Sequence, residues 1–143
     1  MADWQATHPD DGVRDGVLAV RLAEKCVADA GETAATLDVL AAAYAEVSPE
    51  AARAFADQWI DNAEKVVEPN RGDIEKSGAM YVAMKQLIDK HGARGISINC
   101  LGGFYGGHIH AYPCLGFHQL LNEGLVGACE CDLRSTATMV AMS

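Results

Sequence analysis

The sequence lacks the features that would mark a membrane protein or a secreted protein. It has no uninterrupted apolar run of about 18 residues, the length that a transmembrane helix requires. Its first residues carry neither the basic region nor the apolar region of a signal peptide. We therefore expect a cytoplasmic protein with no membrane partner.

Basic residues are also scarce, since 11 Lys and Arg stand against 20 Asp and Glu, which gives a formal net charge of −9. This balance argues against a general binder of nucleic acid or of anionic membranes. A negatively charged protein of this kind binds cations and neutral solutes more readily than anions. The five cysteines are odd in number and too sparse for a disulfide scaffold, so we expect reduced thiols.

What is present fits a globular α/β domain. Half of the 143 residues are hydrophobic and 22% are charged, enough for one domain with a real core. Residues 96–100 and 125–129 are short apolar runs of the kind that form buried strands. Between them, Pro113 can begin a helix and Gly124 can end it. The pattern predicts a βαβ unit of a parallel sheet, with a glycine-rich loop over 101–112.

Helices are predicted before and after this unit. Apolar spacing indicates helices over 13–30, 33–47, 49–67 and roughly 73–91, and Asp132 can cap a last one. Asp73 or Asn70 can cap the fourth of these helices, and Gly92 can end it. Ser48 and Pro49 start the third helix, in which Phe55, Trp59 and Val66 would face inward. The last helical pattern is still running at the end of the sequence, and two strands make a small sheet. We therefore expect 1–143 to be a single partial α/β domain of a longer protein, truncated at its C-terminus.

The polar groups of the βαβ unit gather where such folds bind ligands, beyond the carboxyl ends of the strands. Glu130 directly follows the second strand, and a carboxylate there can serve as a metal ligand or as an acid/base. Asp132 is a second candidate, although it can equally act as a helix cap. His108 and His110, between the glycines and the helix, would point to one side of an extended loop and could contact a polyol or a metal. They could also be ordinary surface histidines.

The cysteines admit a zinc site as an alternative. Cys129 and Cys131, with Cys100, Cys114 and His108, could supply soft ligands. However, the sequence has no CxxC pair and its spacings fit no common zinc finger. Small buried hydrophobic residues are the more ordinary role for most of these cysteines.

The segment PCLGFHQLLNEGLVGACECDLRSTATM carries a family resemblance. Pro113 and Cys114 begin a helix, a Leu-x-x-x-Gly turn follows at 120–124, and Ala-Cys-Glu-x-Asp stands at 128–132 before a Thr- and Ala-rich helix. This run resembles the L-fucose isomerase-like family, which is related to arabinose isomerases, and the resemblance extends over about 37–143. Cys131 departs from the small or polar residue that is common between the Glu and the Asp.

The resemblance implies a function. Members of the family interconvert an aldose and a ketose through an enediol, assisted by Mn²⁺ that a Glu, an Asp and a His hold. The glutamate corresponds to Glu130, which would also transfer protons, whereas the Asp and the His would lie further along a longer chain. We expect part of a metal-dependent sugar isomerase with a monosaccharide substrate, forming a homo-oligomer at full length and inactive as this piece alone. The alternative is a non-catalytic carbohydrate-binding or regulatory module on the same scaffold.

Overall fold

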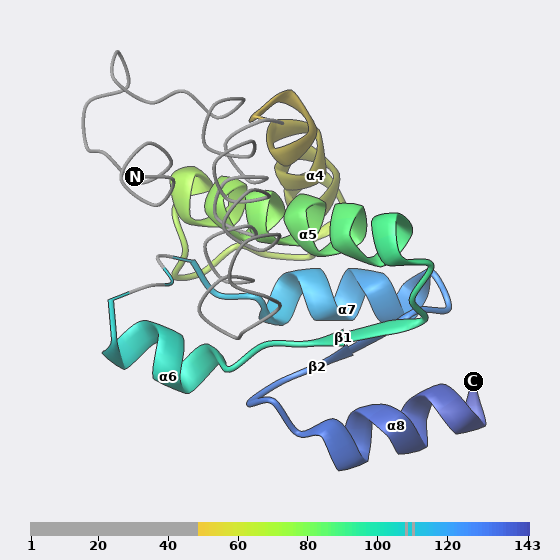
Figure 1. Cartoon of the computed structure of the whole chain (residues 1–143). Coiled ribbons are helices and arrows are strands. Elements are labelled where there is room, and N and C mark those ends of the chain that lie inside the picture. The colour runs from red at the N-terminus through yellow and green to blue at the C-terminus, as the bar shows by residue number, and fades with distance from the viewer. Residues whose placement is uncertain (1–48, 108, 110) are drawn as a thin grey trace. The chain divides into compact units, whose positions relative to one another are not determined.

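The computed structural model of the chain describes residues 49–107, 109 and 111–143 (Figure 1). Contacts divide the chain into two units, Met1–Pro49 and Glu50–Ser143, and the second is described by itself. The helices predicted over 13–30 and 33–47, and the cap at Ser48, lie outside the described residues, as do His108 and His110. None of the described helices is long and apolar enough to cross a membrane.

Helices alternate with two short strands along the described chain. The order is α4 (Pro49–Asn62), α5 (Arg71–His91), β1 (Gly95–Ser97), α6 (Cys100–Tyr105), α7 (Cys114–Asn122), β2 (Val126–Ala128) and α8 (Leu133–Met142). The strands pair in parallel, with Gly95 opposite Val126 and Ser97 opposite Ala128. The predicted βαβ arrangement and the mixed α/β class are therefore confirmed.

The strand pair lies between two layers of helices. Helices α5 and α7 cover one face, and α8 packs on both strands from the other (Figure 1). The core forms between α5 and α7, where four buried side chains meet: Met84, Ile88, Phe117 and Leu120. All four are at most 4% exposed. Ile96 from β1 and Leu125, the residue before β2, pack against this cluster, so the core joins the helical layer to the sheet.

Local signals set the ends of α5, as the sequence predicted. The side chain of Asn70 accepts a hydrogen bond from the Asp73 N–H (3.1 Å), and the Asp73 carboxylate accepts one from the Asn70 N–H (3.2 Å). This reciprocal capping box satisfies two N–H groups that the first turn leaves free. At the other end Gly92 has φ +59°, and the Ala93 N–H donates to the Ile88 carbonyl (2.9 Å). This left-handed ending is the one that glycine permits.

Helix α7 ends in the same way. Gly124 has φ +76°, and the Leu125 N–H donates to the Leu120 carbonyl (2.9 Å). The Gly124 N–H also donates to the Leu121 carbonyl (3.1 Å), and both hydrogen bonds satisfy carbonyls of the last helical turn. Pro113 stands at the N-cap, one residue before the first turn. The predicted helix is thus confirmed within one residue at its start.

The prediction for α4 was too long. The helix begins at Pro49 as predicted but ends at Asn62, and 63–70 is irregular. The Asn62 side-chain amide donates to the Gln58 carbonyl (2.7 Å), which satisfies one carbonyl of the last turn. Phe55 is buried as expected, whereas Val66 is 42% exposed and does not face inward.

The predicted strand over 96–100 and the loop over 101–112 also need correction. The strand ends at Ser97, and Cys100 begins the short helix α6 rather than closing the strand. The cause is Asn99, whose side chain accepts a hydrogen bond from the Gly102 N–H (3.1 Å). Asparagine is among the preferred N-cap residues, so a helical turn begins here despite the glycines that follow. The second strand is likewise shorter than predicted.

Helix α7 approaches its neighbours so closely that two positions require glycine. A Cβ on Gly127 in β2 would lie 2.7 Å from the Phe117 Cα and 2.6 Å from its ring. A Cβ on Gly116 would lie 2.5 Å from the Met84 methyl group and 3.1 Å from the Tyr81 Cα. Backbone therefore meets backbone on both sides of α7.

We predict that Gly127→Ala lowers the free energy of unfolding by about 3 kcal/mol, the upper end of the usual cost of overpacking. The added methyl group would overlap a backbone atom, which cannot rotate away as a side chain can. The matched control is Gly124→Ala, whose Cβ meets no atom within 4 Å and which bears only the cost of φ +76°, about 1 kcal/mol. Urea unfolding followed by circular dichroism measures both. Equal midpoints for the two variants would contradict the close contact.

Candidate functional site

The two strand ends stay joined beyond the strands themselves. The Ile98 N–H donates to the Ala128 carbonyl (3.4 Å), and the Cys131 N–H donates to the Ile98 carbonyl (3.1 Å). The residues that follow β1 and β2 are therefore neighbours at one edge of the sheet. We call 98–100 and 129–132 the strand-end edge. It is the place at which open parallel sheets bind ligands.

Glu130 lies on this edge, as the sequence predicted. It is exposed and follows the buried strand β2 after one intervening residue. Its φ is +62° and that of Cys131 is +52°, and these are the non-glycine residues with positive φ among those described. Such left-handed conformations are uncommon for residues other than glycine and often occur at functional positions. Here they also turn the chain from β2 into α8.

Asp132 acts as the N-cap of α8. One carboxylate oxygen accepts the Ser135 N–H (3.0 Å), and the other accepts the Ser135 hydroxyl (2.6 Å). The Ser135 hydroxyl, and then its N–H, lower the pKa of this carboxyl. The capping role that the sequence left open is therefore real. Both oxygens already accept hydrogen bonds, which reduces their availability for a ligand.

Three thiols come together beside Glu130. Cys100 begins α6, Cys114 begins α7 and Cys129 follows β2, and the Cys129 thiol has the other two thiols as hydrogen-bonding neighbours. The sulfur is partly desolvated although the residue as a whole is exposed. This desolvation, and then the two neighbouring thiols, raise the pKa of Cys129 to about 11. The thiols of Cys100, Cys114 and Cys129 form no disulfide bond.

The donors of the strand-end edge do not make a metal site by themselves. No group of three or more His, Cys, Asp or Glu side chains in the described part of the chain is arranged to hold a metal ion. The described residues therefore form neither a complete manganese site nor a complete zinc site. Any metal bound at Glu130 would need ligands from outside the described residues, and the candidates His108 and His110 are among the residues that the structure does not describe.

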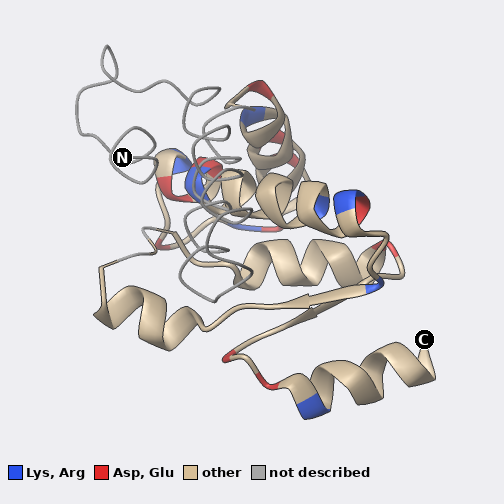
Figure 2. Ribbon diagram, in the orientation of Figure 1, with Lys and Arg blue, Asp and Glu red and all other residues tan. Residues whose placement is uncertain are grey.

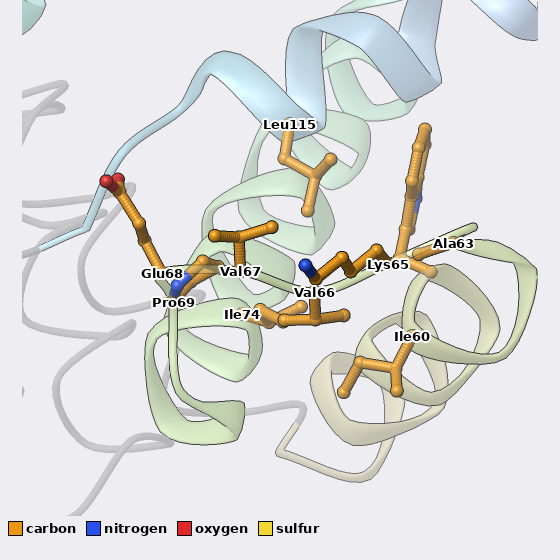
Figure 3. A pocket seen from close by; sticks show the side chains of 10 residues that line it. Ile60, Ala63, Lys65, Val66, Val67, Glu68, Pro69, Ile74 and Leu115 are labelled. Atoms are coloured by element: carbon orange, nitrogen blue, oxygen red, sulfur yellow. The ribbon is translucent and has the colours of Figure 1, made fainter.

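A cavity away from this edge was missed by the sequence reasoning. It measures about 400 Å³ and lies among the end of α4, the segment 63–70, Ile74 of α5 and Leu115 of α7 (Figure 3). Continuing α4 to 67 in the sequence prediction concealed it, because the irregular segment 63–70 forms part of its wall.

Comparisons with protein-family models, with curated proteins and with solved structures found no match in any of the three.

We predict that Cys129 resists alkylation at neutral pH. With a pKa of about 11, its thiolate fraction at pH 8 is on the order of a hundredfold below that of an ordinary cysteine, and the thiolate is the reactive form. The measurement is peptide-resolved mass spectrometry of iodoacetamide labelling between pH 7 and 11. In the matched variant Cys114→Ala one neighbouring thiol is gone, so labelling of Cys129 should become faster. Labelling at the rate of a free cysteine in wild type would contradict the cluster.

We predict that Asp132→Ala destabilises α8 at pH 7, whereas Asp132→Asn, which keeps a capping oxygen, has a smaller effect. Because the folded pKa of Asp132 is lowered, its stabilisation is present above the ordinary aspartate pKa and is lost as pH falls through the lowered value. The difference between wild type and Asp132→Ala in urea midpoint should therefore shrink below about pH 4. A difference that is constant down to pH 2 would count against the charged cap.

Proposed function

We propose that this chain is part of a metal-dependent sugar isomerase in which Glu130 is the catalytic carboxylate. The observation that carries the proposal is the position of Glu130, which is exposed in a left-handed turn at the carboxyl end of a buried parallel strand. The resemblance of 113–139 to L-fucose isomerase-like proteins supplies the reaction class. The substrate would be a monosaccharide.

In this proposal Glu130 moves a proton between adjacent carbons of the sugar. The carboxylate removes the proton from the carbon beside the aldehyde and returns it to the former aldehyde carbon. The aldehyde oxygen takes up a proton from water as the enediol forms, and the hydroxyl of the neighbouring carbon releases one to water as the ketone forms. The protons therefore balance, and no external oxidant or reductant is needed. The exposure of Glu130 lets its carboxylate reach a substrate at the sheet edge.

The resemblance also implies Mn²⁺, with Glu130 as one ligand. Bound there, such an ion would polarise the sugar oxygens. Oxygen ligands suit such a cation, and Glu130 offers them. The described donors are too few to hold it alone, so the other ligands are proposed to come from residues outside the described part. His108 and His110 remain proposed contacts to the sugar, and Asp132 a weaker one because of its capping bonds.

A second candidate is a non-catalytic carbohydrate-binding module. The exposure of Glu130 at the sheet edge suits it as well, because a carboxylate can accept hydrogen bonds from sugar hydroxyls. The same sheet edge would then bind a sugar without turning it over. Fold alone does not separate the two functions, because one scaffold can host both.

We predict that Glu130→Gln lowers the isomerisation rate by about 10²–10⁴-fold, the usual contribution of an acid/base group, because the amide cannot exchange the proton. The change keeps the side-chain shape, so the circular dichroism spectrum should not change. The assay is ketose formation from a panel of aldoses with Mn²⁺, using the protein as its gene encodes it. Glu64→Gln, which neutralises an exposed carboxylate in the segment after α4, is the matched control and should retain full activity.

The outcomes separate the candidates. A Glu130→Gln protein as active as wild type would remove Glu130 from the mechanism. Saturable sugar binding by wild type without any ketose formation would favour the binding module instead. Neither result depends on knowing the sugar in advance, because the panel covers pentoses and hexoses of both series.

A further inference from the structure

A mostly apolar cavity of about 400 Å³ lies beside the end of α4 (Figure 3). Eight of its ten lining residues are apolar, and the other two are Lys65 and Glu68. Its size falls at the small end of the range for ligand pockets in proteins, about 300–1,000 Å³. Mostly apolar walls with a few polar groups are also typical of such pockets. The cavity is separate from the strand-end edge, so what it binds does not depend on the proposed isomerase function.

The early end of α4 creates this cavity. From Ala63 onward the chain leaves the helix and runs to Asn70 without regular structure. This path leaves Val66 42% exposed and Val67 73% exposed, while Ile74 and Leu115 form the wall behind them. Apolar surface that is left in water in this way is a source of binding free energy for a ligand that covers it.

A positive charge stands at the cavity. Figure 3 shows the Lys65 side chain extended along the lining, whereas the Glu68 carboxylate points away from the other lining side chains. Lys65 is exposed and makes no ion pair among the described residues. The ammonium group is therefore available to an anionic ligand, and it is the cation that lines this cavity.

Trp59 adds a hydrogen-bond donor to the lining. Its indole N–H is buried and has no hydrogen-bond partner among the described residues. Buried donors are normally paired, so an unpaired one calls for an explanation. An acceptor atom on a bound ligand that reached the indole would provide the partner.

We propose that this cavity binds a small amphiphilic carboxylate, meaning a molecule with an apolar chain or ring and one carboxylate. The apolar body would cover Val67, Ile74 and Leu115, and the carboxylate would pair with the Lys65 ammonium. The sign of the ligand charge follows from Lys65, and its apolar body follows from the eight apolar lining residues. A sugar does not fit this description, because its hydroxyl groups would lose water to apolar walls without finding partners.

The experiment is a fluorescence titration of the 143-residue chain with sodium octanoate. The chain has two tryptophans, so Trp4→Phe leaves Trp59 as the reporter in the cavity wall. Octan-1-ol has the same chain length without the charge, and acetate has the charge without the chain. We expect saturable quenching or a spectral shift with octanoate, weaker binding of octanol, and none with acetate.

Two lysine variants test the charge. Lys65→Met keeps the apolar stem and should weaken octanoate by up to about fivefold, the range for an exposed ion pair, while leaving octanol unchanged. Lys76→Met removes an exposed lysine from α5, which does not line the cavity at that position, and should bind octanoate as wild type does. Val67→Asp, at a position that is 73% exposed and so tolerates the change, should abolish binding by placing a carboxylate at the mouth.

Three results would overturn the proposal. They are the absence of any saturable signal with octanoate, equal affinities for octanoate and octanol, and equal losses in Lys65→Met and Lys76→Met. Circular dichroism of each variant confirms that a lost signal does not reflect a lost fold.

Discussion

The close approach of helix α7 to its neighbours determines the rest of the described structure. Gly127 lets the backbone of β2 pass under Phe117, and Gly116 lets α7 lie against α5. With the layers this close, the side chains of Met84 and Leu120 are almost completely buried between them. Because protein interiors are packed as densely as crystals, a single added methyl group at either glycine would separate the layers. The sheet has two strands, so this helical cover supplies most of its stabilising contacts.

The same packing determines where the strand-end edge lies. Once β2 lies beside β1, the chain must turn out of the buried layer and start α8 within a few residues. Glu130 and Cys131 make that turn in left-handed conformations, and Asp132 then caps the helix. The turn holds Glu130 out in solvent, while Cys129 stays against the thiols of the two helix starts. The turn thus places an exposed carboxylate one residue away from Cys129, whose pKa is raised. Figure 2 shows the acidic residues of this turn apart from the charged ends of α5.

Sequence reasoning succeeded where a local signal decides the structure. Gly92 and Gly124 end helices because their left-handed conformation suits glycine, and the apolar runs identify two parallel strands. It failed where two local signals compete or where tertiary contacts decide. Asn99 starts a helix inside an expected strand and loop, and Asn62 ends α4 before its apolar pattern stops. The topology rule placed Glu130 just beyond the end of β2, where the structure has it, but the cavity beside Lys65 depends on the path of an irregular segment that no spacing rule describes.

The central claim is that Glu130 marks the ligand-binding edge of this domain, and paramagnetic broadening by Mn²⁺ tests it most directly. In a ¹H–¹⁵N spectrum of the labelled protein, substoichiometric Mn²⁺ should broaden the amide signals of 98–102 and 129–132 before those of other segments. In Glu130→Gln this selectivity should disappear, while weak broadening near other surface carboxylates such as Asp57 remains. Broadening that is strongest elsewhere, or that is unchanged by the substitution, would contradict the assignment of Glu130 to a ligand-binding edge.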